Sequence, residues 1–333
     1  MPSPDEPLLI ATGLRKTYRA GRGLGARGRV SAVDDVSLTL SAGETLGVVG
    51  ESGCGKSTLA RMLVGLERPD TGSVRYAGTE VATARGATRR RLRRSVQMVF
   101  QDPLTALNPR MPVLDLVAEP LDVHRLARGT ARGDRVAELL DLVGLAPEMM
   151  QRFPHEFSGG QRQRIGIARA LATEPRVIIC DEPVLALDVS VQAQVVNLLA
   201  DLQARLGLGL VFIAHDLAVV RHVSHRVAVM YLGRLAELGP APEVYGRPAH
   251  PYTQALLSAA PIRHPRDRDR DRIMLAGDPP SPVDPPTGCR FHTRCPRAEA
   301  VCRTAVPDLT AMAPGHTAAC HLATAPDTAG TSA

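Results

Sequence analysis

The sequence contains almost no lysine and few aromatic residues. Lys16 and Lys56 are its only lysines, so 38 of the 40 basic residues are arginines, and tryptophan is absent. Aromatic residues make up 3% of the chain, which leaves little to stack on single-stranded nucleic acid, and the net charge of +6 comes from arginine spread along its whole length. We therefore expect no nucleic-acid partner. A lysine retained in so lysine-poor a chain, such as Lys56, is a candidate functional residue.

Long apolar stretches are also missing. No run approaches the roughly 18 residues that a membrane-spanning helix needs, and the start, MPSPDEPLLIATG, lacks the basic and then apolar regions of a signal peptide. The 333 residues, 44% hydrophobic and 22% charged, have the balance of a globular protein with about two structural units. We expect a soluble, cytoplasmic chain that serves a membrane only through other proteins.

A glycine-rich motif follows a strongly apolar segment. Residues 45–49 read TLGVV, typical of a buried strand, and the next nine residues read GESGCGKST before a helical run to about Gly65. This is the pattern G-x-x-x-x-G-K-[ST] in its strand–loop–helix context, where backbone amides and the helix N-terminus face phosphate oxygens. We expect Lys56 to contact the β- and γ-phosphates and Ser57 to bind Mg²⁺. The predicted nucleotide-binding residues of this loop are Gly50, Glu51, Ser52, Gly53, Cys54, Gly55, Lys56, Ser57 and Thr58.

An acidic pair ends a second apolar segment. Residues 177–182 read VIICDE, which predicts a parallel strand buried on both faces, with Asp181 and Glu182 at its carboxyl end. Asp181 would bind Mg²⁺, directly or through water, and Glu182 would polarise the attacking water. Together with the phosphate loop, this pair indicates an NTPase.

A third motif indicates which class of NTPase this is. The segment FSGGQRQRIGIARAL, residues 157–171, places a small-residue turn before a helix, which is a second potential anion site. The segment lies just before the Asp181 strand, and it resembles the signature of the ATP-binding cassette (ABC) ATPases. In that family the signature contacts ATP bound to another subunit. The residues that match it are Ser158, Gly159, Gly160 and Gln161.

The resemblance covers about residues 8–260 and assigns roles to further residues. Tyr18 matches the aromatic residue that stacks on adenine, and Asp188 matches the loop that crosses the dimer interface. Gln101 matches the glutamine that couples the nucleotide to transport, and His215 matches the switch histidine near the γ-phosphate. The resemblance thus implies a catalytic group of Glu182, His215 and Gln101, and a Mg²⁺ site of Ser57, Gln101 and Asp181. Because no motif is missing, we expect a site that hydrolyses ATP.

The order of the apolar segments predicts an α/β fold. Alternating strands and helices indicate a P-loop NTPase core with a parallel sheet and helices on its faces. We assign residues 1–260 to this ABC ATPase domain, with a helical subdomain inserted at about 102–170. Within that subdomain Val136, Leu139, Leu140 and Val143 share one helix face. The arginine run at 89–94 is expected to be a solvated helix before the Val96 strand.

Several segments are expected to lie outside the core. The Gly/Arg-rich loop at 19–29 should be exposed. The alternating charges at 263–272 and the prolines at 278–286 predict an extended connection that leads away from the core. We assign residues 261–322 to a small C-terminal extension and expect residues 323–333 to be disordered.

The extension contains four of the six cysteines. Cys54 and Cys180 are expected to be small packing residues, whereas Cys289, Cys295, Cys302 and Cys320 cluster in a segment with few large apolar side chains. A cytosolic location disfavours disulfides, so a metal site could staple this segment. The spacing C-x5-C-x6-C-x17-C matches neither the usual zinc nor the bacterial ferredoxin pattern. An iron–sulfur cluster, a zinc ion and free thiols therefore all remain possible. We expect the cysteine segment to lie far from the nucleotide site.

The C-terminal segments refine the resemblance. HPYTQALLSAAP (250–261) and GCRFHTRCP (288–296) resemble the ATPases of oligopeptide and dipeptide importers, and QDPLTALNPRM (101–111) resembles their F-type subunit. This implies an ATP-hydrolysing subunit of a peptide importer at the cytoplasmic face of the cell membrane, with a [4Fe–4S] cluster on the four cysteines.

The implied partners are a paralogous ATPase subunit, two transmembrane permease subunits and, indirectly, an extracytoplasmic substrate-binding protein. Two alternatives are an importer of nickel or glutathione and a soluble ABC ATPase of DNA repair or translation. The soluble class usually has coiled-coil insertions or tandem cassettes, which this sequence lacks.

Overall fold

A computed structural model describes residues 7–20, 28–259 and 273–324. Most of the Gly/Arg-rich loop, the segment of alternating charges and the end of the tail lie outside the described residues. Within the described ranges, two β-sheets and two clusters of buried side chains form the framework. No helix of that part of the chain is long and apolar enough to cross a membrane.

The main sheet has eight strands in the order β11-β12-β10-β9-β3-β8-β7-β6. Five neighbouring strands, from β9 to β6, are parallel, and the apolar runs of β3, β7 and β8 are buried along their whole length. The parallel sheet expected from the sequence is therefore confirmed. The strands are β3 Thr45–Val49, β6 Val96–Val99, β7 Val177–Asp181, β8 Gly209–Ala214, β9 Arg226–Tyr231, β10 Arg234–Pro240, β11 Thr310–Ala313 and β12 His316–Ala318.

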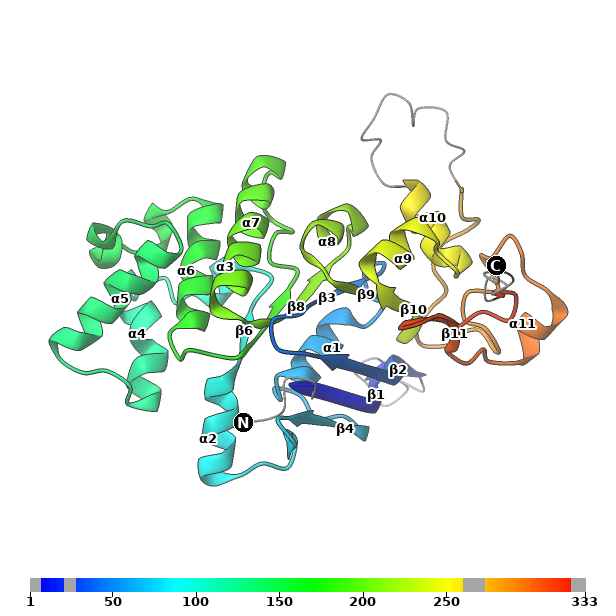
Figure 1. Ribbon diagram of the computed structural model, residues 1–333, viewed down its shortest axis with the longest axis horizontal. Helices are drawn as coiled ribbons and strands as arrows, with labels where there is room; N and C mark the ends of the chain where they lie inside the picture. The colour runs from blue at the N-terminus through cyan, green and yellow to red at the C-terminus, as the bar shows by residue number, and fades with distance from the viewer. Residues whose placement is uncertain (1–6, 21–27, 260–272, 325–333) are drawn as a thin grey trace, which may run out of the picture.

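A second, antiparallel sheet packs over the first helix after the phosphate loop. Its order is β2-β1-β4-β5, with β1 Leu9–Ala20, β2 Gly28–Leu40, β4 Thr71–Tyr76 and β5 Thr79–Glu80. Helix α1, Lys56–Leu63, lies between this sheet and β3 (Figure 1), and apolar residues of all three belong to one buried cluster. The alternation of strands and helices in the sequence did not predict this separate sheet.

The helices between β6 and β7 gather at one end of the molecule, on the left of Figure 1. They are α3 Pro103–Ala106, α4 Val113–His124, α5 Thr130–Leu142 and α6 Gly159–Leu171, with short 3₁₀ turns at Pro147–Gln151 and Pro154–Glu156. Helix α2, Gly86–Ser95, precedes β6 and buries only Leu92, so the arginine run is a solvated helix as expected. The later helices are α7 Val189–Leu206, α8 Leu217–Val223, α9 Ala241–Gly246, α10 Pro251–Ala259 and α11 Ala300–Thr304.

The C-terminal extension packs back onto the core. Strand β12 pairs with β10, so the extension adds two antiparallel strands to the edge of the main sheet. In the proline-rich segment, the Pro282 carbonyl accepts a hydrogen bond from the Ser31 amide of β2 at 3.3 Å. The buried Phe291 belongs to the main core cluster rather than to a core of its own. For residues 278–286, the expectation of a connection that leads away from the core is therefore wrong, while residues 263–272 of the same prediction lie outside the described residues.

Candidate nucleotide-binding site

Four neighbouring parallel strands end at one edge of the main sheet. Gln101, Glu182 and His215 follow β6, β7 and β8, and the phosphate loop starts at Gly50 after β3. The pairing register brings these four carboxyl ends to nearly the same level, the edge at which open α/β sheets bind ligands. Gln101 and His215 are exposed there, so both are accessible to a ligand at this edge.

The phosphate loop wraps tightly before helix α1. Gly55 precedes the helix with φ +105°, and a Cβ atom there would lie 1.9 Å from the Ala32 carbonyl oxygen, so glycine is required. The buried Lys56 ammonium donates hydrogen bonds to the carbonyl oxygens of Gly50 at 2.8 Å and Glu51 at 3.0 Å. The loop thus holds its lysine inside the curve that would surround phosphates.

The acidic pair expected from the sequence meets the phosphate loop. Nζ of Lys56 lies 3.5 Å from Oε1 of Glu182, and the Ser57 hydroxyl donates to Oδ1 of Asp181 at 3.0 Å. Burial raises the pKa of Asp181, the nearby Glu182 carboxylate adds to the rise, and the Ser57 hydrogen bond opposes it. A buried carboxylate beside a hydroxyl is a pair of oxygen ligands that suits Mg²⁺, whose charge would stabilise the ionised form.

Glu182 has an unusual backbone conformation. Its φ of +46° lies in the left-handed region, which costs a non-glycine residue about 1–3 kcal/mol. Its amide donates to the Ile213 carbonyl of β8 at 3.1 Å, so the turn is anchored to the neighbouring strand. This conformation places the carboxylate beside the Lys56 ammonium of the phosphate loop.

Tyr18 of β1 lies beside the start of helix α1. Its hydroxyl interacts with Thr58 and Glu67, and burial together with the Glu67 hydrogen bond raises the pKa of Tyr18 to about 12. The Lys16 ammonium lies 5.7 Å from the centroid of the tyrosine ring. The phenol is therefore neutral at physiological pH, and the ring stands next to the last residue of the phosphate motif.

The signature residues form the N-terminus of helix α6. The Ser158 hydroxyl accepts from the Gln161 amide at 3.3 Å, and the Gln161 side chain accepts from the Ser158 amide at 3.0 Å, which is a capping box. Gly160 is buried against α7, because a Cβ there would lie 2.3 Å from Cγ1 of Val191. Ser158 and Gly159 are exposed, so the turn presents its backbone to solvent.

The loop between β7 and α7 carries apolar side chains on the surface. Asp188 immediately precedes α7 and is exposed. Its neighbours Leu185 and Val189 are 42% and 82% exposed, which is unusual for large apolar residues. An exposed acidic and apolar loop beside the nucleotide edge is a suitable surface for another protein.

Sequence reasoning missed two residues that reach the phosphate loop from the C-terminal part of the chain. The Tyr252 hydroxyl accepts from the Glu51 amide at 3.0 Å, and Nη1 of Arg294 donates to both carboxylate oxygens of Glu51, at 3.0 and 2.9 Å. The expectation that the cysteine-containing extension lies far from the nucleotide site is therefore wrong. The signal available in the sequence was the Tyr in HPY and the Phe in GCRFHTRCP, because aromatic residues are scarce in this chain.

The four distal cysteines do not form a metal site as they are placed. All six cysteines are free thiols, and across residues 7–20, 28–259 and 273–324 no group of three or more His, Cys, Asp or Glu side chains is arranged to hold a metal ion. Burial raises the pKa of Cys289 and Cys295, which disfavours the thiolates that bind metals. The structure therefore does not support the expected [4Fe–4S] cluster.

Comparison with known families gives two matches along the chain. Residues 33–185 match the ABC transporter family, and residues 236–302 match the oligopeptide/dipeptide transporter C-terminal region. Two dimeric ATP-binding cassettes are also similar in structure, one of them in a post-hydrolysis state with ADP and Pi. Each has a TM-score of 0.62 at 29% identity and covers 70% of this chain and 98% of its own. The fold and the site thus define an ABC ATPase, which hydrolyses ATP.

Curated relatives narrow this class. The chain is 50% identical over 322 residues to the oligopeptide transport ATP-binding protein AppF of Bacillus subtilis, covering 96% of this chain and 98% of the relative. It is 53% identical to the di/tripeptide transport protein DppF of Pseudomonas aeruginosa (91% and 94% covered) and 56% identical to OppF of Salmonella typhimurium (84% of each). The chain belongs to the family of oligopeptide and dipeptide ABC transporter ATP-binding proteins.

Proposed function

We propose that this protein couples ATP binding and hydrolysis to the uptake of oligopeptides or dipeptides across the cytoplasmic membrane. The observation that carries the proposal is the connected group of Lys56, Glu182, Ser57 and Asp181 at the carboxyl edge of the sheet. The peptide cargo is supported by the names of relatives that match along nearly the whole chain. Those names favour peptides over nickel or glutathione, and transport over DNA repair or translation.

Each group at the edge has a proposed task. Lys56 and the amides of the phosphate loop bind the β- and γ-phosphates, and Tyr18 contacts the adenine. Glu182 accepts the proton of the attacking water, while Gln101 and His215 orient groups around the γ-phosphate. Ser57, Asp181 and Gln101 would hold Mg²⁺, which when bound neutralises phosphate charge.

We propose that the complete site forms between two subunits. The exposed signature turn at Ser158 and Gly159 would contact ATP on a paralogous ATPase, and the loop at Asp188 would lie in that interface. The helices near Gln101 would receive two permease subunits, which would hold the protein at the cytoplasmic face of the membrane. A substrate-binding protein would deliver the peptide on the other side.

Reconstitution tests this function. The purified protein should be mostly monomeric with low ATPase activity, which should rise when the paralogue and the permeases are added. Lys56→Ala should weaken ATP binding by about 10- to 100-fold, because it removes a charged hydrogen-bond donor facing the phosphates. High specific activity in a demonstrably monomeric preparation would contradict the two-subunit site, and ATP hydrolysis that no peptide stimulates would contradict the cargo.

We also propose, from the family resemblance alone and not from the placement of the side chains, that Cys289, Cys295, Cys302 and Cys320 ligate a [4Fe–4S] cluster. Anaerobically purified protein should then be brown and contain about four irons per chain, and Cys295→Ser should remove the colour. Stoichiometric zinc in a colourless protein would assign a zinc site. Metal-free protein with four reactive thiols and an ordered extension would show that the extension needs no metal.

A further inference from the structure

The C-terminal extension reaches the phosphate loop through Arg294, whose side chain is largely shielded from solvent. Nη1 of Arg294 lies 3.0 and 2.9 Å from the two carboxylate oxygens of Glu51, the second residue of the loop. The Arg294 side chain is 9% exposed and that of Glu51 is 26% exposed, so the contact is shielded from solvent on the arginine side. A charged hydrogen bond of this kind is stronger than one between neutral groups.

A second residue contacts the same position through the backbone. The Tyr252 hydroxyl accepts from the Glu51 amide at 3.0 Å, and the tyrosine is fully buried. Its ring centroid lies 4.7 Å from that of Tyr231 and 5.4 Å from that of Phe291, and the last two lie 5.2 Å apart. Three of the ten Phe and Tyr residues of the chain thus pack together directly behind the phosphate loop.

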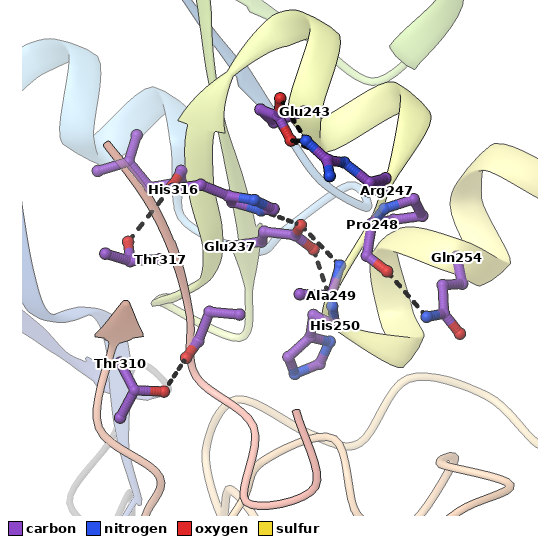
Figure 2. Close-up of polar contacts among 12 residues, drawn as sticks. Glu237, Glu243, Arg247, Pro248, Ala249, His250, Gln254, Thr310, His316 and Thr317 are labelled. Carbon is purple, nitrogen blue, oxygen red and sulfur yellow. Dashed lines mark hydrogen bonds and ion pairs between the residues drawn. The ribbon is translucent and has the colours of Figure 1, made fainter. Parts of the chain in front are cut away.

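The position of Tyr252 depends in turn on the buried Glu237 of β10. The Glu237 carboxylate accepts from the amides of Ala249 and His250, each at 2.9 Å, and from Nε2 of His316 in β12 at 2.7 Å (Figure 2). Nδ1 of His250 then accepts from the Tyr252 amide at 3.0 Å. One carboxylate therefore connects the His-Pro-Tyr segment, β10 and the C-terminal extension.

Glu51 links these contacts to the nucleotide site. Its carbonyl oxygen accepts from the Lys56 ammonium at 3.0 Å and from the Cys54 amide at 3.2 Å. Arg294 and Tyr252 thus contact the carboxylate and the amide of Glu51. The carbonyl of the same residue binds Lys56 and Cys54 within the phosphate loop. Shifting Glu51 would move groups that face the phosphates.

We propose that the C-terminal extension and the preceding helix α10 position the phosphate loop, with Arg294 of the extension and Tyr252 of α10 as positioning residues that hold Glu51 in the ATP-binding conformation. The nucleotide affinity of the subunit then depends on how the extension is seated. The inference rests on the proposed function only in taking ATP as the ligand. Neither residue contacts the reacting atoms, so their loss should weaken ATP binding and leave the chemical step nearly unchanged.

The test measures ATP binding to the full-length subunit and ATPase kinetics of the assembled transporter. Arg294→Gln should raise the Kd and the KM for ATP about three- to tenfold, with kcat within about twofold of wild type; the effect is smaller than that of a lost direct contact because Arg294 acts on ATP only through Glu51. Arg294→Lys, which keeps the charge, should recover part of the affinity. Tyr252→Phe, which keeps the ring and removes the acceptor of the Glu51 amide, should weaken binding in the same direction.

Two controls separate positioning from general damage. Arg303→Gln changes an exposed arginine on α11 of the same extension and should leave the Kd unchanged. In a Glu51→Gln background, Arg294→Gln should raise the Kd for ATP by a much smaller factor than it does in wild type, because the ion pair is already broken. Wild-type ATP affinity in folded Arg294→Gln, or an equal effect of Arg294→Gln in both backgrounds, would overturn the proposal.

The proposal can be tested even if one variant is unstable. If Arg294→Gln fails to fold, Tyr252→Phe and Arg294→Lys decide: wild-type affinity in both would overturn the proposal, and weakened affinity with unchanged kcat would support it. A subunit whose ATP affinity depends on Arg294 but whose transporter imports no peptide would refute the proposed cargo and leave this inference standing.

Discussion

The nucleotide edge and the C-terminal extension are built in different ways. At the edge, the functional residues lie at or shortly after the ends of neighbouring parallel strands, so the register of the sheet brings them together. The extension has no such register over most of its length and is held by single polar contacts, such as the partly buried pair of Arg294 with Glu51 and the buried pair of His316 with Glu237. The sheet therefore positions the residues of the nucleotide edge, whereas a few side-chain contacts hold the extension in place.

The largest effect should come from the edge. Glu182→Gln should keep ATP binding and slow hydrolysis at least about 10²-fold, because an amide cannot accept the proton of the attacking water. It should also trap the closed pair of ATPase subunits. The measurement is the ATPase rate of the assembled transporter together with ATP occupancy, and near wild-type turnover would refute the role of Glu182.

The two regions also differ in how far the sequence predicts them. The phosphate motif and the strand that ends in Asp181 are local patterns, so strand, loop and acidic pair could be placed correctly. The contact of Arg294 with Glu51 joins residues 243 positions apart, and that of His316 with Glu237 joins residues 79 apart. No local pattern encodes such pairs.

Composition explains the main error in the extension. The prolines at 278–286 predict a connection without secondary structure, but they do not determine its direction. The direction is set by the pairing of β12 with β10 and by the burial of Phe291. A glutamate within the apolar strand RLAELGP was a further local hint, because a buried Glu237 requires donors from elsewhere in the fold.

In the extension, the largest effect should come from its buried pair. His316→Ala should lower the free energy of unfolding by about 2–3 kcal/mol, because the fully buried Glu237 carboxylate loses one of its hydrogen-bond donors. Thermal unfolding and limited proteolysis of residues 273–324 measure this. The neighbouring Thr317→Ala, which removes a partly buried bond to the Leu238 carbonyl, should cost under about 1 kcal/mol. Equal effects of both changes would show that the Glu237 contact is not the main anchor.

Acidification should change the contributions of two buried groups to the free energy of unfolding in opposite directions: His250, before α10, and Asp181, at the nucleotide edge. Burial lowers the pKa of His250 from 6.5 to about 4, so between these values the unfolded chain binds more protons and stability falls as the pH falls. The raised pKa of Asp181 acts in reverse, because the folded state then takes up a proton first and gains stability on acidification. Between pH 7 and pH 5, His250 alone should remove about 2 kcal/mol.

The His250 contribution can be isolated by substitution. His250→Asn keeps an acceptor for the Tyr252 amide and cannot titrate. Denaturant unfolding at pH 7, 6 and 5 should show wild type losing about 2 kcal/mol more than the variant on acidification. Parallel pH curves for the two proteins would mean that His250 does not titrate on unfolding, and the acid sensitivity would then lie elsewhere.

The smallest effect tests the close packing behind the nucleotide edge. In helix α6, a Cβ at Gly160 would lie 2.3 Å from Cγ1 of Val191, whereas a Cβ at Gly166 meets no atom within 4 Å. Gly160→Ala should therefore lower the free energy of unfolding by about 1–2 kcal/mol, because α6 must shift away from α7. Gly166→Ala, on the same helix, should raise it by about 0.5–1 kcal/mol through lower chain entropy in the unfolded state. Because the shift moves Ser158 and Gly159, Gly160→Ala should also reduce ATPase activity of the assembled pair while ATP binding to the single subunit stays unchanged.

Thermal unfolding measures both substitutions. If Gly160→Ala destabilises the protein and Gly166→Ala stabilises it, the close packing of α6 on α7 fixes the signature turn. If both substitutions stabilise the protein, α7 moves to make room for the added methyl group and the packing does not fix the turn.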